Sequence, residues 1–115
     1  VNGERYAPDV AFISRQRQPE LAREGYNPNP PDLAIEVDFP SSPATQRHLR
    51  FKLSNYLAAG TTVWIVVPEL RHVEVYAPGQ APRIYREDES IALAGPLAGL
   101  VVAVNDIFPP AKAES

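Results

Sequence analysis

The strongest constraint on the fold lies in residues 32–67, where one helical pattern separates two apolar, β-rich runs. Residues 32–37 (DLAIEV) alternate like a strand, and residues 61–67 (TTVWIVV) are nearly continuously apolar, as in a central strand buried on both faces. Between them, the stretch from about Pro43 to Ala59 has the spacing of an amphipathic helix, and Gly60 is suited to end it. This order predicts a right-handed βαβ crossover between two parallel strands.

The segments around this unit are shorter, and the 13 prolines of the chain cluster between them. Residues 9–14 (DVAFIS) predict a further buried strand, residues 72–77 a half-exposed strand and residues 83–87 an edge strand. Residues 90–104 predict short extended pieces, and residues 105–108 predict one helical turn. We therefore expect an α/β (α+β) fold: a mixed β-sheet with one main packed helix and a C-terminal β-meander.

The size of the chain, 115 residues, allows one domain, which we expect over residues 1–108 with a tail at 109–115. The chain begins at an Asn2-Gly3 turn signal without an initiator Met, so we expect that an upstream part is missing. No Cys is present, which excludes disulfides and Cys-based zinc sites. No apolar run approaches the roughly 20 residues that span a bilayer, and the start lacks the features of a signal peptide. A cytoplasmic protein without a membrane partner is the default expectation.

Charge limits the function classes without deciding among them. The net charge of −3 gives no overall basic field, which argues against a nonspecific DNA-binding module. It argues less against a nuclease, because an acidic metal site lowers the net charge while Arg and Lys lie elsewhere. Arg47 and Arg50, together with His48, give the predicted helix a basic face that could contact phosphates, although a solvated helix surface is the commoner explanation.

One acid conflicts with its surroundings and marks a candidate site. Glu36 lies inside the apolar strand between Ile35 and Val37, and such local conflicts tend to occur at functional sites. Asp9 opens the earlier strand, so the two carboxylates converge if these strands are neighbours. Two such oxygen ligands suit Mg²⁺ or Mn²⁺, and Lys52 on the helix could act on the phosphate as a point charge. The pattern leaves an alternative equally open, in which both acids are solvated or capped at strand ends. For Lys52 alone, extension along the helix edge is the commoner explanation.

A series of motifs in a fixed order resembles the Uma2 family (DUF820) of bacterial restriction-endonuclease-like proteins. The motifs are PDVAFIS, PPDLAIEV, KLSNYLAAG, TTVWIVVPE, HVEVY and a final AGL…IF, and they cover residues 8–108. The resemblance implies a PD-(D/E)xK type fold and a Mg²⁺-dependent DNA endonuclease. It implies that Asp9 is the acid of the PD motif, that Glu36 is the acid of the second motif, and that Lys52 is the lysine moved onto the helix, in a K-x-x-x-Y pattern completed by Tyr56. These three residues would be catalytic, with Asp9 and Glu36 holding the metal.

The sequence also departs from the family pattern. Asp38 stands where an ordinary ExK motif keeps its lysine, and it is either a third metal ligand or, as we favour, a turn residue. His48 and Val67 replace acids that family members often carry, and the N-terminal helix and hairpin of the family are absent. The alternative function is therefore a catalytically inactive nuclease-fold module that binds nucleic acid or a protein partner. Exposed strand edges would also allow a homodimer.

The remaining candidates favour structural roles. We expect His48 and His72 to be surface residues, because neither has a partner at metal-ligand spacing. Trp64 lies in the predicted central strand, where packing is the better explanation.

Overall fold

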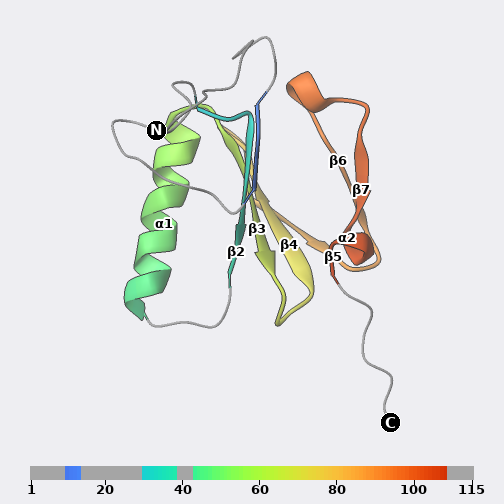
Figure 1. The fold of residues 1–115 in the computed structure, drawn as a ribbon, viewed down its shortest axis with the longest axis horizontal. Coiled ribbons are helices and arrows are strands. Elements are labelled where there is room, and N and C mark those ends of the chain that lie inside the picture. The colour runs from blue at the N-terminus through green and yellow to red at the C-terminus, as the bar shows by residue number, and fades with distance from the viewer. Residues whose placement is uncertain (1–9, 14–29, 39–42, 109–115) are drawn as a thin grey trace.

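The computed structural model describes residues 10–13, 30–38 and 43–108, and within these ranges the fold is built on a mixed five-stranded sheet (Figure 1). The strands lie in sequence order, and β2 and β3 are parallel, whereas every other neighbouring pair is antiparallel. The predicted mixed sheet is confirmed, and β3, β4 and β5 form a meander. The strands are β1 (Val10–Phe12), β2 (Leu33–Val37), β3 (Thr62–Val67), β4 (His72–Tyr76) and β5 (Arg83–Arg86).

One long helix, α1 (Pro43–Ala58), joins β2 to β3 and covers one face of the sheet (Figure 1). Gly60 ends it with a φ of +84°, a backbone conformation that favours glycine. As the spacing predicts, Leu49, Leu53 and Tyr56 pack on the sheet, where they meet an apolar cluster with Ala34, Val63 and Ile65. The strand–helix–strand unit is thus held by the amphipathic pattern of its own sequence.

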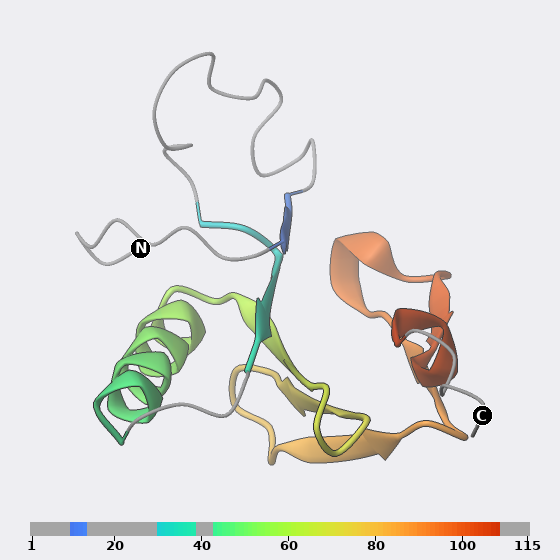
Figure 2. The ribbon, with the colours of Figure 1, turned by 60° about the horizontal axis from the view of Figure 1, so that its bottom comes forward.

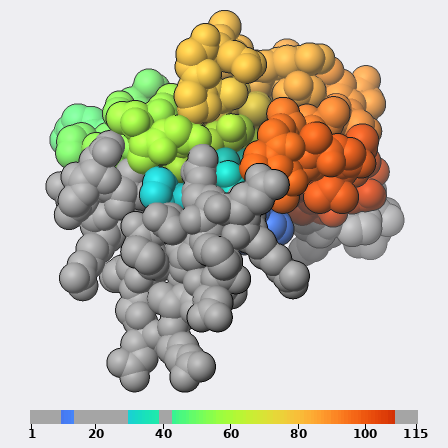
Figure 3. Space-filling view, turned by 90° about the horizontal axis from the view of Figure 1, so that it is seen from above, coloured from blue at the N-terminus to red at the C-terminus, as the bar shows by residue number. Residues whose placement is uncertain are grey.

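The opposite face of the sheet packs against the C-terminal part of the chain. This part comprises β6 (Ser90–Ala92), the 3₁₀ turn η1 (Gly95–Leu97), β7 (Val101–Ala103) and α2 (Val104–Ile107). Strands β6 and β7 pair with each other as a separate antiparallel sheet. Seen from above, α1 and this C-terminal unit lie on opposite sides of the molecule with the sheet between them (Figure 3). The main core lies on this second face, and its buried members are Leu33, Trp64, Val66, Val73, Ile91, Val104 and Phe108.

Figure 2 shows the C-terminal unit beside the five-stranded sheet. Residues of both line an apolar groove of about 660 Å³. Strand β1, at the edge of the sheet, borders this groove with Val10 and Phe12, which are 46% and 45% exposed. The prediction of a buried first strand is therefore wrong for its described part, because an edge strand has a neighbour on one side only. No helix within the described ranges is long and apolar enough to cross a membrane.

Candidate functional site

Glu36 and Lys52 meet beneath helix α1. Glu36 shares the face of β2 that carries Ala34, because side chains two residues apart point the same way, and this is the face that α1 covers. Lys52 reaches it from the helix, with 2.9 Å between Lys52 Nζ and Glu36 Oε1. The two side chains are 14% and 7% exposed, so the ion pair is largely shielded from water. The structure thus brings together the predicted strand acid and helix lysine.

Burying this ion pair costs folding free energy. Removing a carboxylate and an ammonium from water carries a large desolvation penalty, and their mutual attraction only partly offsets it. The neighbouring positions on the same face are Ala34 on β2 and Val63 and Ile65 on β3, all of them buried and apolar. This shielded charged pair is therefore the candidate functional site.

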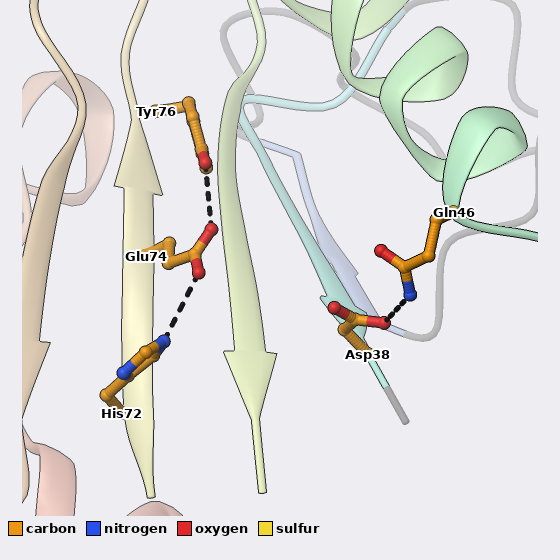
Figure 4. Close-up of polar contacts among 5 residues, drawn as sticks. All are labelled: Asp38, Gln46, His72, Glu74 and Tyr76. Atoms are coloured by element: carbon orange, nitrogen blue, oxygen red, sulfur yellow. Dashed lines mark hydrogen bonds and ion pairs between the residues drawn. The ribbon is translucent and has the colours of Figure 1, made fainter. Parts of the chain in front are cut away.

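Asp38 takes part in the contact between β2 and the start of α1. Its backbone N–H donates to Val66 O at 2.8 Å, and its carboxylate Oδ1 accepts a hydrogen bond from Gln46 Nε2 at 2.7 Å (Figure 4). The carboxylate therefore ties the end of β2 to the first turn of the helix. This placement supports a structural role, and a role in metal binding stays a prediction.

The third predicted site residue, Asp9, lies outside the described residues. Among the residues that the structure describes, no three His, Cys, Asp or Glu side chains lie close enough together to hold a metal ion.

A second polar cluster, on β4, faces the same side of the sheet as Glu36. His72, Glu74 and Tyr76 alternate with Val73, which is buried in the core of the opposite face. Glu74 Oε1 accepts a hydrogen bond from the Tyr76 hydroxyl at 2.8 Å, and Glu74 Oε2 lies 3.2 Å from His72 Nε2 (Figure 4). Because a carboxylate only accepts, His72 donates here through Nε2. The expectation that His72 is a surface residue is wrong, since it is 8% exposed.

The strand register relates the two polar clusters. Ile65 on β3 pairs with Glu36 on one side and with Glu74 on the other, so both acids lie in one row across three strands. Strands are about 4.8 Å apart, which separates the Cα atoms of the two acids by roughly 10 Å. The only sequence signal for the second cluster is the period of two in H-x-E-x-Y, which places its members on one face without indicating their hydrogen bonds.

Tyr76 is held as a hydrogen-bond donor. Partial burial, the hydrogen bond to Glu74 and the charge of Glu74 together raise the pKa of Tyr76 to about 12, against an opposing effect from Arg50. The hydroxyl therefore keeps its proton at neutral pH.

The structure also places the remaining sequence candidates. His48 is exposed on α1, as predicted, and Arg47 and Arg50 are exposed on the same helix. Val67 ends β3 in partly buried surroundings, and Trp64 belongs to the main core, which confirms a packing role.

Comparisons with known proteins agree with this fold and with the motif order. A solved structure described as a "putative nuclease belonging to DUF820" from Anabaena variabilis superposes with a TM-score of 0.70 and 22% sequence identity. The match covers 89% of this chain and 59% of that one, so this chain spans little more than half the length of its structural relative. No curated protein sequence is significantly similar to the chain. The family model of Uma2, described as "Putative restriction endonuclease", matches residues 1–105, and the chain therefore belongs to the Uma2 family.

Proposed function

We propose that this protein is a metal-dependent endonuclease that hydrolyses phosphodiester bonds in DNA at a site containing Glu36 and Lys52. The observation that carries the proposal is the shielded ion pair, in which the Lys52 ammonium lies 2.9 Å from the Glu36 carboxylate on the face of the sheet that also carries the buried residues Ala34, Val63 and Ile65. Membership of a family described as restriction endonucleases and the nuclease-like fold support the reaction class.

Asp9 would be the second acid of this site, and the register of described residues supports that role. Val10 on β1 pairs with Ile35 on β2, and the two strands are antiparallel. If this pairing continued by one residue, it would set Asp9, which lies outside the described residues, opposite Glu36. Side chains of directly opposed residues point to the same face, so the two carboxylates would converge beneath α1.

A divalent cation such as Mg²⁺ or Mn²⁺ fits the chemistry of this donor set. Two carboxylates supply the hard oxygen ligands that these ions prefer, with Asp38 as a possible third. When bound, such an ion lowers the pKa of a coordinated water and stabilises charge on a phosphate. Glu36 and Asp9 would hold it, and the Lys52 ammonium would compensate negative charge that develops on the phosphoryl oxygens.

DNA cleavage by purified variants tests the proposal. The wild-type protein should cut DNA in the presence of Mn²⁺ or Mg²⁺, and EDTA should stop the reaction. Glu36→Gln should abolish cleavage, and Lys52→Met should lower the rate by roughly 10²–10³-fold, the usual effect of removing one charge-stabilising group. Glu89→Gln is the matched control, because Glu89 lies in an exposed pair far along the chain.

Two outcomes would contradict the proposal. One is a folded wild-type protein that neither binds Mn²⁺ nor cuts plasmid, linear duplex or single-stranded DNA. The other is a Glu36→Gln variant that cuts as fast as wild type. The first outcome would favour the alternative, a catalytically inactive module that binds nucleic acid or a protein partner.

A further inference from the structure

Helix α1 carries a concentration of positive charge that the rest of the chain does not share. It contains Arg47, Arg50 and Lys52, and none of the 14 Asp and Glu residues of the protein. The whole chain has a net charge of −3, so this helix is a basic element on an acidic protein. Acidic macromolecules are therefore drawn to α1 more than to the protein as a whole.

The charged residues of α1 divide between its two sides. Lys52 turns inward to Glu36 and is 14% exposed, whereas Arg47 and Arg50 are exposed on the helix surface. Neither arginine forms an ion pair with another described residue. The outward arginines are thus not neutralised by an acidic partner within the described part of the chain.

Phe51 is exposed on the same helix as these arginines. It is 55% exposed, although it is one of the largest apolar side chains in the chain. Residues three and four apart on a helix are neighbours, so Phe51 lies one turn from Arg47, whereas Arg50 points about 100° away from it around the helix axis. An exposed aromatic ring near arginines is a combination with which proteins bind unpaired nucleic acid, since the ring stacks on a base and the guanidinium groups contact phosphates.

We propose that the outward face of α1, formed by Arg47, Arg50 and Phe51, binds single-stranded nucleic acid. Charge complementarity with the phosphate backbone selects the class of partner. Exposure of the Phe51 ring selects an unpaired strand, because the bases of a duplex already stack on one another. This inference goes beyond the proposed function, because the Glu36–Lys52 pair lies beneath α1, on the side of the helix that packs on the sheet.

Binding of a fluorescently labelled oligodeoxythymidine, followed by anisotropy in EDTA, tests the inference without cleavage. Phe51→Ala should weaken binding by roughly 5- to 100-fold, the effect of losing one stacked base. The Arg47→Ala/Arg50→Ala double variant should lower the slope of log affinity against log salt by about 1.4, or about 0.7 for each lost phosphate contact on a single strand. Ile84→Ala and Arg86→Ala, both at exposed positions on β5, should bind like wild type.

Three outcomes would overturn the inference. In the first, Phe51→Ala and the double arginine variant bind the oligonucleotide as tightly as the β5 controls. In the second, Phe51→Ala weakens a hairpin duplex as strongly as the single strand, which excludes stacking on an unpaired base. In the third, the wild-type protein does not bind the oligonucleotide at all, and α1 then serves a protein partner or no partner. Far-UV circular dichroism confirms that each variant is folded.

The result is separable from that of the cleavage assay. If α1 binds single strands and no DNA form is cut, the inference stands and the endonuclease proposal fails. Suppose instead that the protein cuts DNA, that Glu36→Gln abolishes cleavage, and that the Phe51 and arginine variants bind the oligonucleotide like wild type. The endonuclease proposal then stands and the inference about α1 fails.

Discussion

The ion pair between Glu36 and Lys52 predicts a strongly asymmetric response to mutation. Lys52→Met removes the ammonium and leaves the carboxylate of Glu36, which is 7% exposed, without its cationic partner. Breaking a buried pair in this way costs about 3–5 kcal/mol of unfolding free energy. Glu36→Gln should cost less, about 1–2 kcal/mol, because the flexible stem of Lys52 lets its ammonium turn toward water.

The double variant Glu36→Gln/Lys52→Met distinguishes the interaction energy of the pair from the cost of burying each charge. Replacing both partners removes both desolvation penalties, so the double variant should lose only about 0–2 kcal/mol, less than Lys52→Met alone. The coupling energy between the two positions should therefore be at least about 2 kcal/mol. Urea unfolding at neutral pH, followed by the fluorescence of Trp64 in the core, measures all four proteins.

The chain offers a matched control for this cycle. Arg83 and Glu89 form a longer pair, 3.6 Å apart, whose side chains are 65% and 37% exposed. Solvent screening limits such a pair to roughly 0–1 kcal/mol, so Glu89→Gln should stay within about 0.5 kcal/mol of wild type. The reasoning is refuted if Lys52→Met costs no more than this control and the coupling energy is zero within error.

Variants at three further positions test other parts of the structure by urea unfolding. The pKa of Tyr76 is raised from its ordinary value of 10.0 to about 12 in the folded protein, so between these pH values the folded state keeps a proton that the unfolded state loses. The free energy of unfolding of the wild-type protein should therefore fall as the pH rises through this window, and that of Tyr76→Phe should fall less. Thr61 is fully buried and donates its hydroxyl to Pro31 O at 2.7 Å, so Thr61→Val should cost about 1–2 kcal/mol and Thr61→Ser less. Gly60 has a φ of +84° with open space around it, so Gly60→Ala should cost about 1 kcal/mol through backbone strain alone.

The sequence predicted the parts of the fold that depend on periodicity. The run 61–67 indicated a central strand, and β3 is buried along most of its length with parallel and antiparallel neighbours on its two sides. The helix stripe of Leu49, Leu53 and Tyr56 was also sufficient to set the face that packs on the sheet. These patterns are set by local chain geometry, so they can be read without knowing the tertiary structure.

Features that depend on the neighbours of a strand could not be predicted in this way. Val10 and Phe12 are apolar and indicated burial, but the position of β1 at the sheet edge leaves them exposed to the groove. His72 looked like a surface residue, yet β4 lies between two strands and its carboxylate neighbour Glu74 takes up the imidazole N–H. Strand order and side-chain hydrogen bonds between elements are not encoded in the period of a single segment.

The position of Lys52 on a helix makes the candidate site depend on tertiary packing. A lysine on the same strand as Glu36 would be placed by the strand itself, whereas Lys52 meets Glu36 only while α1 is docked. Docking rests on the apolar stripe and on the contact between Gln46 and Asp38, which joins the start of α1 to the end of β2.

Apolar residues of similar size at positions 36 and 52 would avoid the cost of burying two charges and would keep the same helix docked. If the pair is present for chemistry, a double variant with apolar residues at both positions should be inactive and at least as stable as Glu36→Gln/Lys52→Met. The opposite result, an unstable double variant whose helix no longer docks, would show that the pair contributes mainly to the fold. The unfolding free energies of these variants are therefore needed to interpret the cleavage assay, because they distinguish loss of a catalytic group from loss of helix docking.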